Sequence, residues 1–164
     1  MDYVIRQADP EEFPALGDLT VQAYLDDCLF PGPDYPYVMV LRDVAARAEG
    51  AETLVAVDEA GSLLGGVAFA LAGSVQAQVS EPGEAEFRAL AVAKAGRGRG
   101  VGAALVEACV QRARDAGCSG VRLSTAPDMR AAHRLYARLG FVRTPERDWS
   151  PVSDVTLLTY LLSL

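Results

Sequence analysis

The sequence has few of the residues that build metal centres, disulfide frameworks and catalytic triads. It contains one histidine and three cysteines, Cys28, Cys109 and Cys118, among 164 residues. One histidine is too few for a typical zinc site or a Ser-His-acid triad. The odd number of cysteines, without metal-ligand spacing, favours buried thiols. We therefore expect no metal and a reducing, cytoplasmic location.

Long apolar runs are also lacking. No apolar stretch approaches the roughly 18 to 20 residues that are needed to span a bilayer. Residues 1–6 do not show the basic and then apolar pattern of a signal peptide. The apolar fraction of 51% and the charged fraction of 23% are ordinary for a globular protein. These features predict one domain over residues 1–164 and no membrane partner.

Positive charge is scarce in the first half of the chain. Residues 1–84 carry three arginines against fifteen acidic residues, whereas residues 85–164 carry twelve basic residues against seven acidic ones. The acidic net charge of −7 argues against a nucleic-acid partner. Either both halves are merely solvated faces, or the basic half attracts an anion. The basic residues gather around a glycine-rich segment, which favours the second interpretation.

Short strands and helices alternate along the chain. The order of elements is βααβββαβαβ(β), with no internal repeat and no linker, which predicts a mixed sheet with helices on both faces. Glycines that follow the last two helices are typical stop signals. We predict helices within 9–24, 38–48, 101–116 and 128–139, and strands at 3–7, 53–57, 62–71, 84–92, 121–124, 141–143 and 155–162.

Three glycines lie where a strand gives way to a helix, in a segment that we call the glycine loop (residues 97–102). Glycine allows backbone angles and a close approach that a side chain would block. The first N–H groups of the following helix have no partner within it, and the helix dipole adds positive potential. Arg97 and Arg99 add donors suited to phosphate. The glycine loop is therefore predicted to bind a diphosphate.

Two other kinds of segment share this glycine pattern. An exposed flexible loop is common for short glycine runs, but the arginines and the helix argue against it. The pattern Gly98-x-Gly100-x-x-Ala103 matches a dinucleotide fingerprint literally. However, five residues separate the strand end at Val92 from Gly98, and the strand 121–124 lacks the acid that binds ribose. A Walker loop is excluded because the chain has no Gly-Lys-Ser/Thr.

Two motifs carry a resemblance to a known family. Arg97-x-x-Gly100-x-Gly102 resembles the Arg/Gln-x-x-Gly-x-Gly/Ala signature of the GNAT acetyltransferases, and the strand 86–92 precedes it at the family's distance. The segment 132–141 is similar to the family's Ala-x-x-Leu-Tyr-x-x-x-Gly-Phe motif. The resemblance implies an α/β fold with a mixed, mostly antiparallel, splayed sheet of six to seven strands and about four helices. It also implies acetyl-CoA as co-substrate and favours a homodimer.

The resemblance also implies roles for individual residues. Tyr136 matches the family's general acid, and Glu86 matches the base carboxylate of some members, with Glu84, Glu81 or a relayed water as alternatives. Met129 stands where the family often has asparagine. The N–H of Leu90 would polarise the thioester carbonyl. Backbone groups of Leu90, Ala91 and Val92 would hold the pantetheine arm, and the pyrophosphate would lie on Arg97, Gly98, Arg99, Gly100, Val101, Gly102 and Ala103.

The acceptor is less defined by the sequence. The family binds its acceptors with the first two helices and the C-terminal hairpin, which here contribute Asp26, Asp27, Tyr35 and Trp149. We expect a small-molecule amine steered by the acidic loop, or the amine of a peptide or lysine. A merely solubilising acidic loop is the alternative. The whole chain is predicted to be an N-acetyltransferase, with a non-catalytic acyl-CoA sensor as the alternative.

Overall fold

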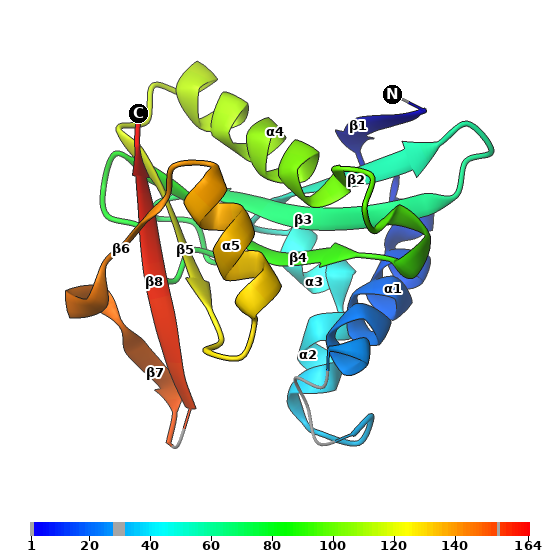
Figure 1. Cartoon of the computed structure of the whole chain (residues 1–164), viewed down its shortest axis with the longest axis horizontal. Coiled ribbons are helices and arrows are strands. Elements are labelled where there is room, and N and C mark those ends of the chain that lie inside the picture. Colours follow the sequence, from blue (N-terminus) through cyan, green and yellow to red (C-terminus); the bar gives the residue numbers. More distant parts are fainter. Residues whose placement is uncertain (1, 28–31, 154) are drawn as a thin grey trace.

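The computed structural model of the chain describes residues 2–27, 32–153 and 155–164. These residues form five α-helices and eight strands around one sheet (Figure 1). The helices are α1 (Phe13–Asp26), α2 (Tyr37–Arg42), α3 (Val44–Ala48), α4 (Val101–Asp115) and α5 (Arg130–Arg138). The strands are β1 (Tyr3–Gln7), β2 (Glu52–Asp58), β3 (Leu63–Leu71), β4 (Glu84–Val92), β5 (Gly120–Thr125), β6 (Val142–Arg143), β7 (Trp149–Val152) and β8 (Val155–Ser163).

The strand order is β1-β2-β3-β4-β5-β8-β6, and β7 pairs with β8 off this path. Among the strand pairs of the described residues, β4–β5 is parallel and the others are antiparallel. The predicted mixed, mostly antiparallel sheet is confirmed. β8 pairs with β5, β6 and β7 of the same chain.

The structure has one helix and one strand more than the sequence predicted. The expected helix 38–48 is two short helices, because Asp43 leaves the helical conformation (φ −81°, ψ 75°) and its side chain accepts the N–H of Ala46. That contact is a typical helix N-cap, so a new helix starts there. The extra strand is β7, which the sequence predicted only as part of a hairpin.

Helices cover both faces of the sheet, as predicted. Alternate residues of β2 point to opposite faces. Leu54 belongs to the large core under α4 and α5, which also contains Leu105 and Tyr136. Its neighbour Val55 belongs to a second core that contains Leu16 of α1. Both faces of the central strands are therefore buried, and the site described below lies at their ends.

The central strands β4 and β5 separate part of the way along their length. Their pairing joins Glu84–Glu86 to Gly120–Arg122 and extends no further. On the other side of β4, the register with β3 shifts between Gly66 and Ala68, and Ala89 adopts a φ of 57°. A residue with positive φ opposite a register shift is a β-bulge, which bends the strand. The bulge turns the end of β4 away from β5 and opens the β4–β5 gap, between residues 87–92 and 123–125.

The cysteines are consistent with buried thiols. Cys109 is buried in α4, and burial raises the pKa of its thiol, whereas Cys118 is half-buried. Cys28 lies outside the described residues. Within the described part of the chain, no three His, Cys, Asp or Glu side chains are grouped as metal ligands would be. In those same residues, each helix is too short or too polar to cross a membrane.

Candidate active site

A pocket occupies the β4–β5 gap. It brings together residues that the sequence predicted for catalysis and for cofactor binding, including Leu90 and Tyr136. Side chains of α1, β4, β5 and α5 surround it, because the bulge leaves room that β5 would otherwise fill. The lining consists of Tyr24, Phe87, Arg88, Ala89, Leu90, Ser124, Thr125, Met129 and Tyr136.

The end of β4 directs backbone donors into this gap. Ala91 pairs with Gly66 of β3, and the N–H of Ala93 donates to the carbonyl of Leu64 at 2.9 Å. Because alternate residues of a strand direct their backbone groups to opposite edges, the N–H groups of Leu90 and Val92 point away from β3. β5 does not pair with β4 at this level. The gap therefore offers N–H groups to a ligand.

The glycine loop leads into α4 as the sequence predicted. Gly98 and Gly100 have φ values of 75° and 76°, which side chains disfavour, and Gly100 is the N-cap of α4. The first intrahelical hydrogen bond runs from the N–H of Ala104 to the carbonyl of Gly100, at 3.0 Å. The N–H groups of residues 101–103 consequently have no acceptor within the helix and form an anion site at its positive end.

The two arginines of the glycine loop diverge. The Arg97 Nη2 atom lies 3.5 Å from the Asp27 carboxylate at the end of α1. Arg99 turns to the opposite side, where its Nη2 atom lies 2.7 Å from the carboxylate of Asp2 and the Tyr3 hydroxyl donates to its carbonyl. The Arg99 hydrogen bond lowers the pKa of the Asp2 carboxyl, and the same contact raises the pKa of Arg99. The predicted arginine pair is thus two separately held side chains.

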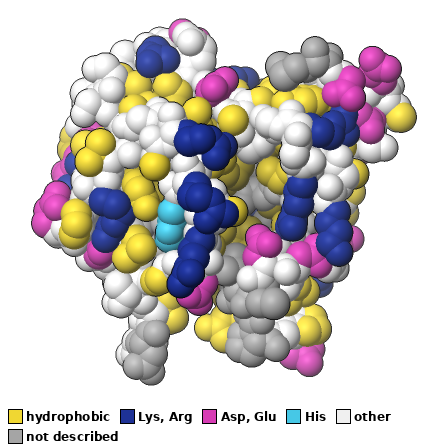
Figure 2. All heavy atoms as spheres, viewed as in Figure 1, with side chains coloured by type: hydrophobic (Ala, Val, Ile, Leu, Met, Phe, Trp, Pro, Cys, Tyr) yellow, Lys and Arg dark blue, Asp and Glu magenta, His cyan; other side chains and the backbone are white. Residues whose placement is uncertain are grey.

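Further basic side chains border the gap. Arg130, Arg134 and Arg138 are exposed and recur every four residues, on one side of α5. Lys94 and Arg97 are exposed on the segment that precedes α4. Figure 2 shows basic side chains on both sides of a hollow in this face of the molecule. The face therefore carries local positive charge, which the net charge of the whole chain conceals.

Tyr136 lies on α5 and is 4% exposed. Its ring packs against Phe87 and Tyr160, with centroids 5.8 Å from each. Burial raises the pKa of the Tyr136 hydroxyl, and the neighbouring Tyr24 and Tyr160 raise it further. The hydroxyl consequently keeps its proton at neutral pH. It can donate that proton or a hydrogen bond to a ligand in the pocket.

Glu86 lies on β4, is 2% exposed, and is held by the loop between β3 and β4. Its Oε1 atom accepts the N–H groups of Gln78, Val79 and Ser80 at 2.9, 3.0 and 2.9 Å. It also accepts the Ser80 hydroxyl at 2.7 Å. These four contacts favour a structural task, because they give four donors of the β3–β4 loop a common acceptor.

The two alternative bases, Glu84 and Glu81, each have an arginine as ion-pair partner. Glu84 accepts from the Nε of Arg122 at 2.6 Å, in an ion pair that is mostly buried. Glu81 lies 2.7 Å from Arg147, which belongs to the connection between β6 and β7. The three glutamates therefore anchor the β3–β4 loop to neighbouring segments of the sheet. None of them lines the pocket in the β4–β5 gap.

The residues predicted to bind the acceptor do not line this pocket either. Asp26 and Asp27 face the glycine-loop region, where Asp26 lies 4.0 Å from Lys94. Tyr35 packs beside a small core between α1 and α2. Trp149 lies on β7, and its indole N–H is buried without a hydrogen-bond partner among the described residues.

Two further residues line the pocket: Tyr24, which belongs to the segments predicted to bind the acceptor, and Arg88, for which the sequence predicted no role. Tyr24 of α1 reaches it from the opposite face, and burial raises the pKa of its hydroxyl to about 12. Arg88 of β4 lines it too and donates to the Gln76 side chain at 2.9 Å. Strand alternation placed Arg88 on the same face as Glu86. Nothing in the sequence indicated the bulge at Ala89, which brings Arg88 to the β4–β5 gap.

Comparisons with known proteins agree with this geometry. Residues 15–141 match the model of the Acetyltransferase (GNAT) family. A GNAT acetyltransferase from Staphylococcus aureus shares the fold, with a TM-score of 0.76, 15% identity and 99% of both chains covered. A GCN5-related N-acetyltransferase from Kribbella flavida has a TM-score of 0.69 and 23% identity, over 99% of this chain and 98% of that one.

A third solved structure is yncA from Salmonella typhimurium, described with its cofactor acetyl-CoA. It has a TM-score of 0.70 and 23% identity, and the match covers 100% of this chain and 95% of that chain. At these identities the structures demonstrate a shared fold. The comparison with curated proteins found no match.

Proposed function

The chain belongs to the GNAT family of acetyltransferases, and we propose that it moves an acetyl group from acetyl-CoA to a primary amine. The amine attacks the thioester directly while both substrates are bound. The observation that carries this proposal is the pocket in the β4–β5 gap, where the backbone of Leu90 and the hydroxyl-bearing ring of Tyr136 meet. The acceptor is a small-molecule amine or an amine of a peptide.

The residues at the gap fit acetyl-CoA. Gly98 and Gly100 adopt positive φ at the start of α4, and residues 101–103 present N–H groups to a pyrophosphate. A Cβ on Gly102 would lie 3.3 Å from Leu135, so the small residue lets α4 start close to α5. Residues 97–103 would hold the pyrophosphate, and the backbone of residues 90–92 would hold the pantetheine arm. Acetyl-CoA supplies the acetyl group as a thioester, and the yncA structure with acetyl-CoA supports this choice.

Two groups of the chain assist the transfer. The Leu90 N–H donates a hydrogen bond to the thioester oxygen, which gains negative charge as the amine attacks. The C–N bond forms and the C–S bond breaks, and Tyr136 gives its proton to the departing sulfur. Because the pKa of Tyr136 is raised, the hydroxyl is protonated before the reaction and suits an acid.

An amine acceptor must also lose a proton, since alkylamines are protonated at neutral pH. Glu86 is the base implied by the family, but its Oε1 atom already accepts four hydrogen bonds. We therefore assign Glu86 the task of positioning the β3–β4 loop. The proton of the amine leaves through water, which was the alternative in the sequence analysis.

A thiol-release assay over a panel of amines tests the proposal. With an accepted amine, Tyr136→Phe should lower kcat by roughly a hundredfold or more, the size of a general-acid contribution. The affinity for CoA, measured by calorimetry, should stay unchanged. Tyr160→Phe removes a phenolic hydroxyl from the same aromatic cluster and serves as the matched control.

Two results would contradict the proposal. Tight CoA binding without turnover of any amine would favour the non-catalytic acyl-CoA sensor. Equal loss of kcat in Tyr136→Phe and Tyr160→Phe would remove the special role of the Tyr136 hydroxyl.

A further inference from the structure

Tyr3 of β1 contacts the glycine loop from the edge of the sheet. β1 is an edge strand, and α4 begins close to it (Figure 1). The Tyr3 hydroxyl donates to the carbonyl of Arg99 at 3.0 Å, although the two residues are 96 positions apart in the chain. Tyr3 is 7% exposed and belongs to the large core under α4 and α5. A donor that is held by core packing therefore restrains the loop.

This hydrogen bond sets the orientation of one peptide group. The C=O and N–H groups of a trans peptide point in opposite directions. Because the Arg99 carbonyl points to Tyr3, the N–H of Gly100 points away from Tyr3. That N–H has no acceptor within the described part of the chain. If the peptide rotated, as flanking glycines permit, a carbonyl oxygen would replace the N–H and would repel an anion at the start of α4.

The segments on either side of this peptide are fixed by packing. Gly96, before the glycine loop, is buried, and Val101, at the start of α4, is 1% exposed. Between them, the Tyr3 hydroxyl is the only hydrogen-bond partner that the described residues give to the backbone of Gly98 and Arg99. Tyr3 therefore restrains the part of the loop that is otherwise free to change conformation.

The side chain of Arg99 is held within the protein at the same place. Its Nη2 atom lies 2.7 Å from the Asp2 carboxylate, and its Nη1 atom donates to the carbonyl of Ala95 at 3.2 Å. Its Cζ atom lies 5.8 Å from the centroid of the Tyr3 ring, within the range of a cation–π contact. The guanidinium group thus has three partners of its own and packs on the ring whose hydroxyl holds the loop.

We propose that Tyr3 positions the glycine loop for the pyrophosphate of acetyl-CoA, and that the Arg99 side chain supports Tyr3 and does not contact the pyrophosphate. This inference rests on the proposed function, which assigns the pyrophosphate to the glycine loop. A loop that is already held in its binding conformation loses less conformational entropy when the ligand binds. Without the Tyr3 hydroxyl, part of the binding free energy is used to order the loop.

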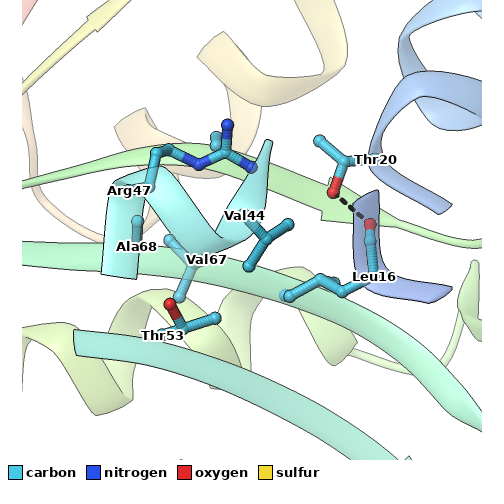
Figure 3. Close-up of a pocket in the computed structure, with 9 residues that line it drawn as sticks. Leu16, Thr20, Val44, Arg47, Thr53, Val67 and Ala68 are labelled. Atoms are coloured by element: carbon cyan, nitrogen blue, oxygen red, sulfur yellow. Dashed lines mark hydrogen bonds between the residues drawn. The ribbon is translucent and has the colours of Figure 1, made fainter. Parts of the chain in front are cut away.

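The variant Tyr3→Phe removes the hydroxyl and keeps the buried ring. It should raise the Kd of CoA, measured by calorimetry, by about three- to tenfold, the range that corresponds to one hydrogen bond. Thr20→Val is the matched control, because the buried Thr20 hydroxyl also donates to a backbone carbonyl, that of Leu16, at 2.7 Å (Figure 3). Leu16 belongs to the core on the other face of the sheet from α4, so the control should change Kd less than twofold.

A shortened acetyl donor separates positioning from a general loss of structure. S-acetylpantetheine keeps the thioester and the pantetheine arm but lacks the pyrophosphate. With an accepted amine, Tyr3→Phe should lower kcat/KM for acetyl-CoA by about three- to tenfold. The kcat/KM for S-acetylpantetheine should change less than twofold, because this donor does not reach the glycine loop. A merely structural role of Tyr3 would lower both values equally.

The variant Arg99→Gln tests the task of the arginine side chain. A guanidinium group that binds the pyrophosphate forms charge-assisted hydrogen bonds, and their loss would raise the Kd of CoA by more than about tenfold. Support of Tyr3 contributes less, so the Kd in Arg99→Gln should rise less than fivefold. A rise of fivefold or more overturns the assignment of the Arg99 side chain.

Hydrogen exchange examines the loop without any ligand. The N–H of Ala104 donates to the carbonyl of Gly100 at 3.0 Å, so its exchange reports local opening at the start of α4. The exchange rate, measured by NMR, should rise at least threefold in Tyr3→Phe and stay unchanged in Thr20→Val.

The outcomes separate this inference from the proposed function. An unchanged Kd of CoA in Tyr3→Phe, equal rises in Tyr3→Phe and Thr20→Val, or equal losses for the two acetyl donors overturn the positioning by Tyr3 and leave the acetyltransferase intact. If the wild-type protein binds no CoA, the proposed function fails. In that case, an unchanged exchange rate of Ala104 in Tyr3→Phe still overturns the restraint of the loop by Tyr3.

Discussion

The carboxylate of Asp27, at the C-terminal end of α1, lies 3.5 Å from the guanidinium group of Arg97 in the glycine loop. Asp26 lies 4.0 Å from Lys94 beside it. Acids at the C-terminus of a helix are disfavoured by its dipole, and these cations compensate for that. Arg97 also belongs to the residues that we assign to the pyrophosphate, and Lys94 lies three residues before it. A bound pyrophosphate and the end of α1 therefore compete for positive charge.

Removing the Asp27 carboxylate, which competes with the pyrophosphate for Arg97, should tighten CoA binding. Asp27→Asn is expected to lower the Kd of CoA by about two- to fivefold, the range that corresponds to an exposed ion pair. The gain should shrink in high salt, because screening weakens both contacts. Calorimetry at low and high ionic strength measures both effects. Asp18→Asn, also on α1 but paired with Arg42, is the control, and weaker CoA binding by Asp27→Asn would contradict the competition.

Substitutions of Glu86 separate anchoring from base catalysis. Glu86→Ala leaves three backbone N–H groups of residues 78–80 without their acceptor, so the free energy of unfolding should fall by about 1–3 kcal/mol. Glu86→Gln keeps an oxygen that can accept those bonds, and its kcat/KM should stay within about threefold of the wild-type value. Denaturant unfolding and thiol release measure these quantities. A folded Glu86→Gln protein that loses about a hundredfold in kcat would restore the base.

The bulge at Ala89 predicts an unusual response to glycine. Ala89 has a φ of 57°, which costs an alanine about 1 kcal/mol and costs glycine almost nothing. Ala89→Gly should therefore leave stability unchanged within about 0.5 kcal/mol, since the greater freedom of the unfolded chain offsets the relief. Ala91→Gly, two residues along, removes a buried methyl from extended backbone and should cost about 1–2 kcal/mol. If urea unfolding shows that Ala89→Gly and Ala91→Gly lose the same free energy of unfolding, Ala89 is not strained.

The Arg143–Asp148 pair predicts a stability that depends on pH. Two Arg143 nitrogens donate to Asp148 at 2.8 and 2.9 Å, and the Thr159 N–H donates to it at 2.9 Å. The Arg143 contact lowers the pKa of the Asp148 carboxyl below 3.8. The charged carboxylate therefore stabilises the fold above pH 3.8, and this contribution is lost as the pH falls through the lower folded pKa.

The variant Asp148→Asn measures that contribution. It should unfold about 1 kcal/mol more easily at pH 7. The difference from the wild type should begin to close as the pH falls below 3.8, where the unfolded chain takes up the proton, and should vanish once the folded carboxyl is protonated at its lower pKa. Urea unfolding between pH 3 and pH 7 follows this change. Asp128→Asn, an exposed acid, serves as the control, and a gap that stays constant down to pH 3 would contradict the assignment.

The sequence alone predicted the local parts of the site. Gly98 and Gly100 before an amphipathic helix predict an anion site, because backbone angles and helix N-termini depend on neighbouring residues. The motif around Tyr136 predicts a tyrosine on the helix that follows the glycine-loop helix. The pattern of residues 84–92 predicts a strand. The mixed sheet follows from the order of these elements. The sequence predicted a single helix over 38–48, where the structure has two. In a sequence pattern, an N-cap aspartate such as Asp43 looks the same as a polar residue inside a helix.

Only the tertiary structure decided which charges meet. Glu86 acquires its partners from residues 78–80, and Asp27 pairs with Arg97. Such pairings depend on packing between segments that lie far apart in the chain, and on a bulge that shifts one strand by a residue. The donors that surround Glu86 come from another segment of the chain, so only the fold identifies them.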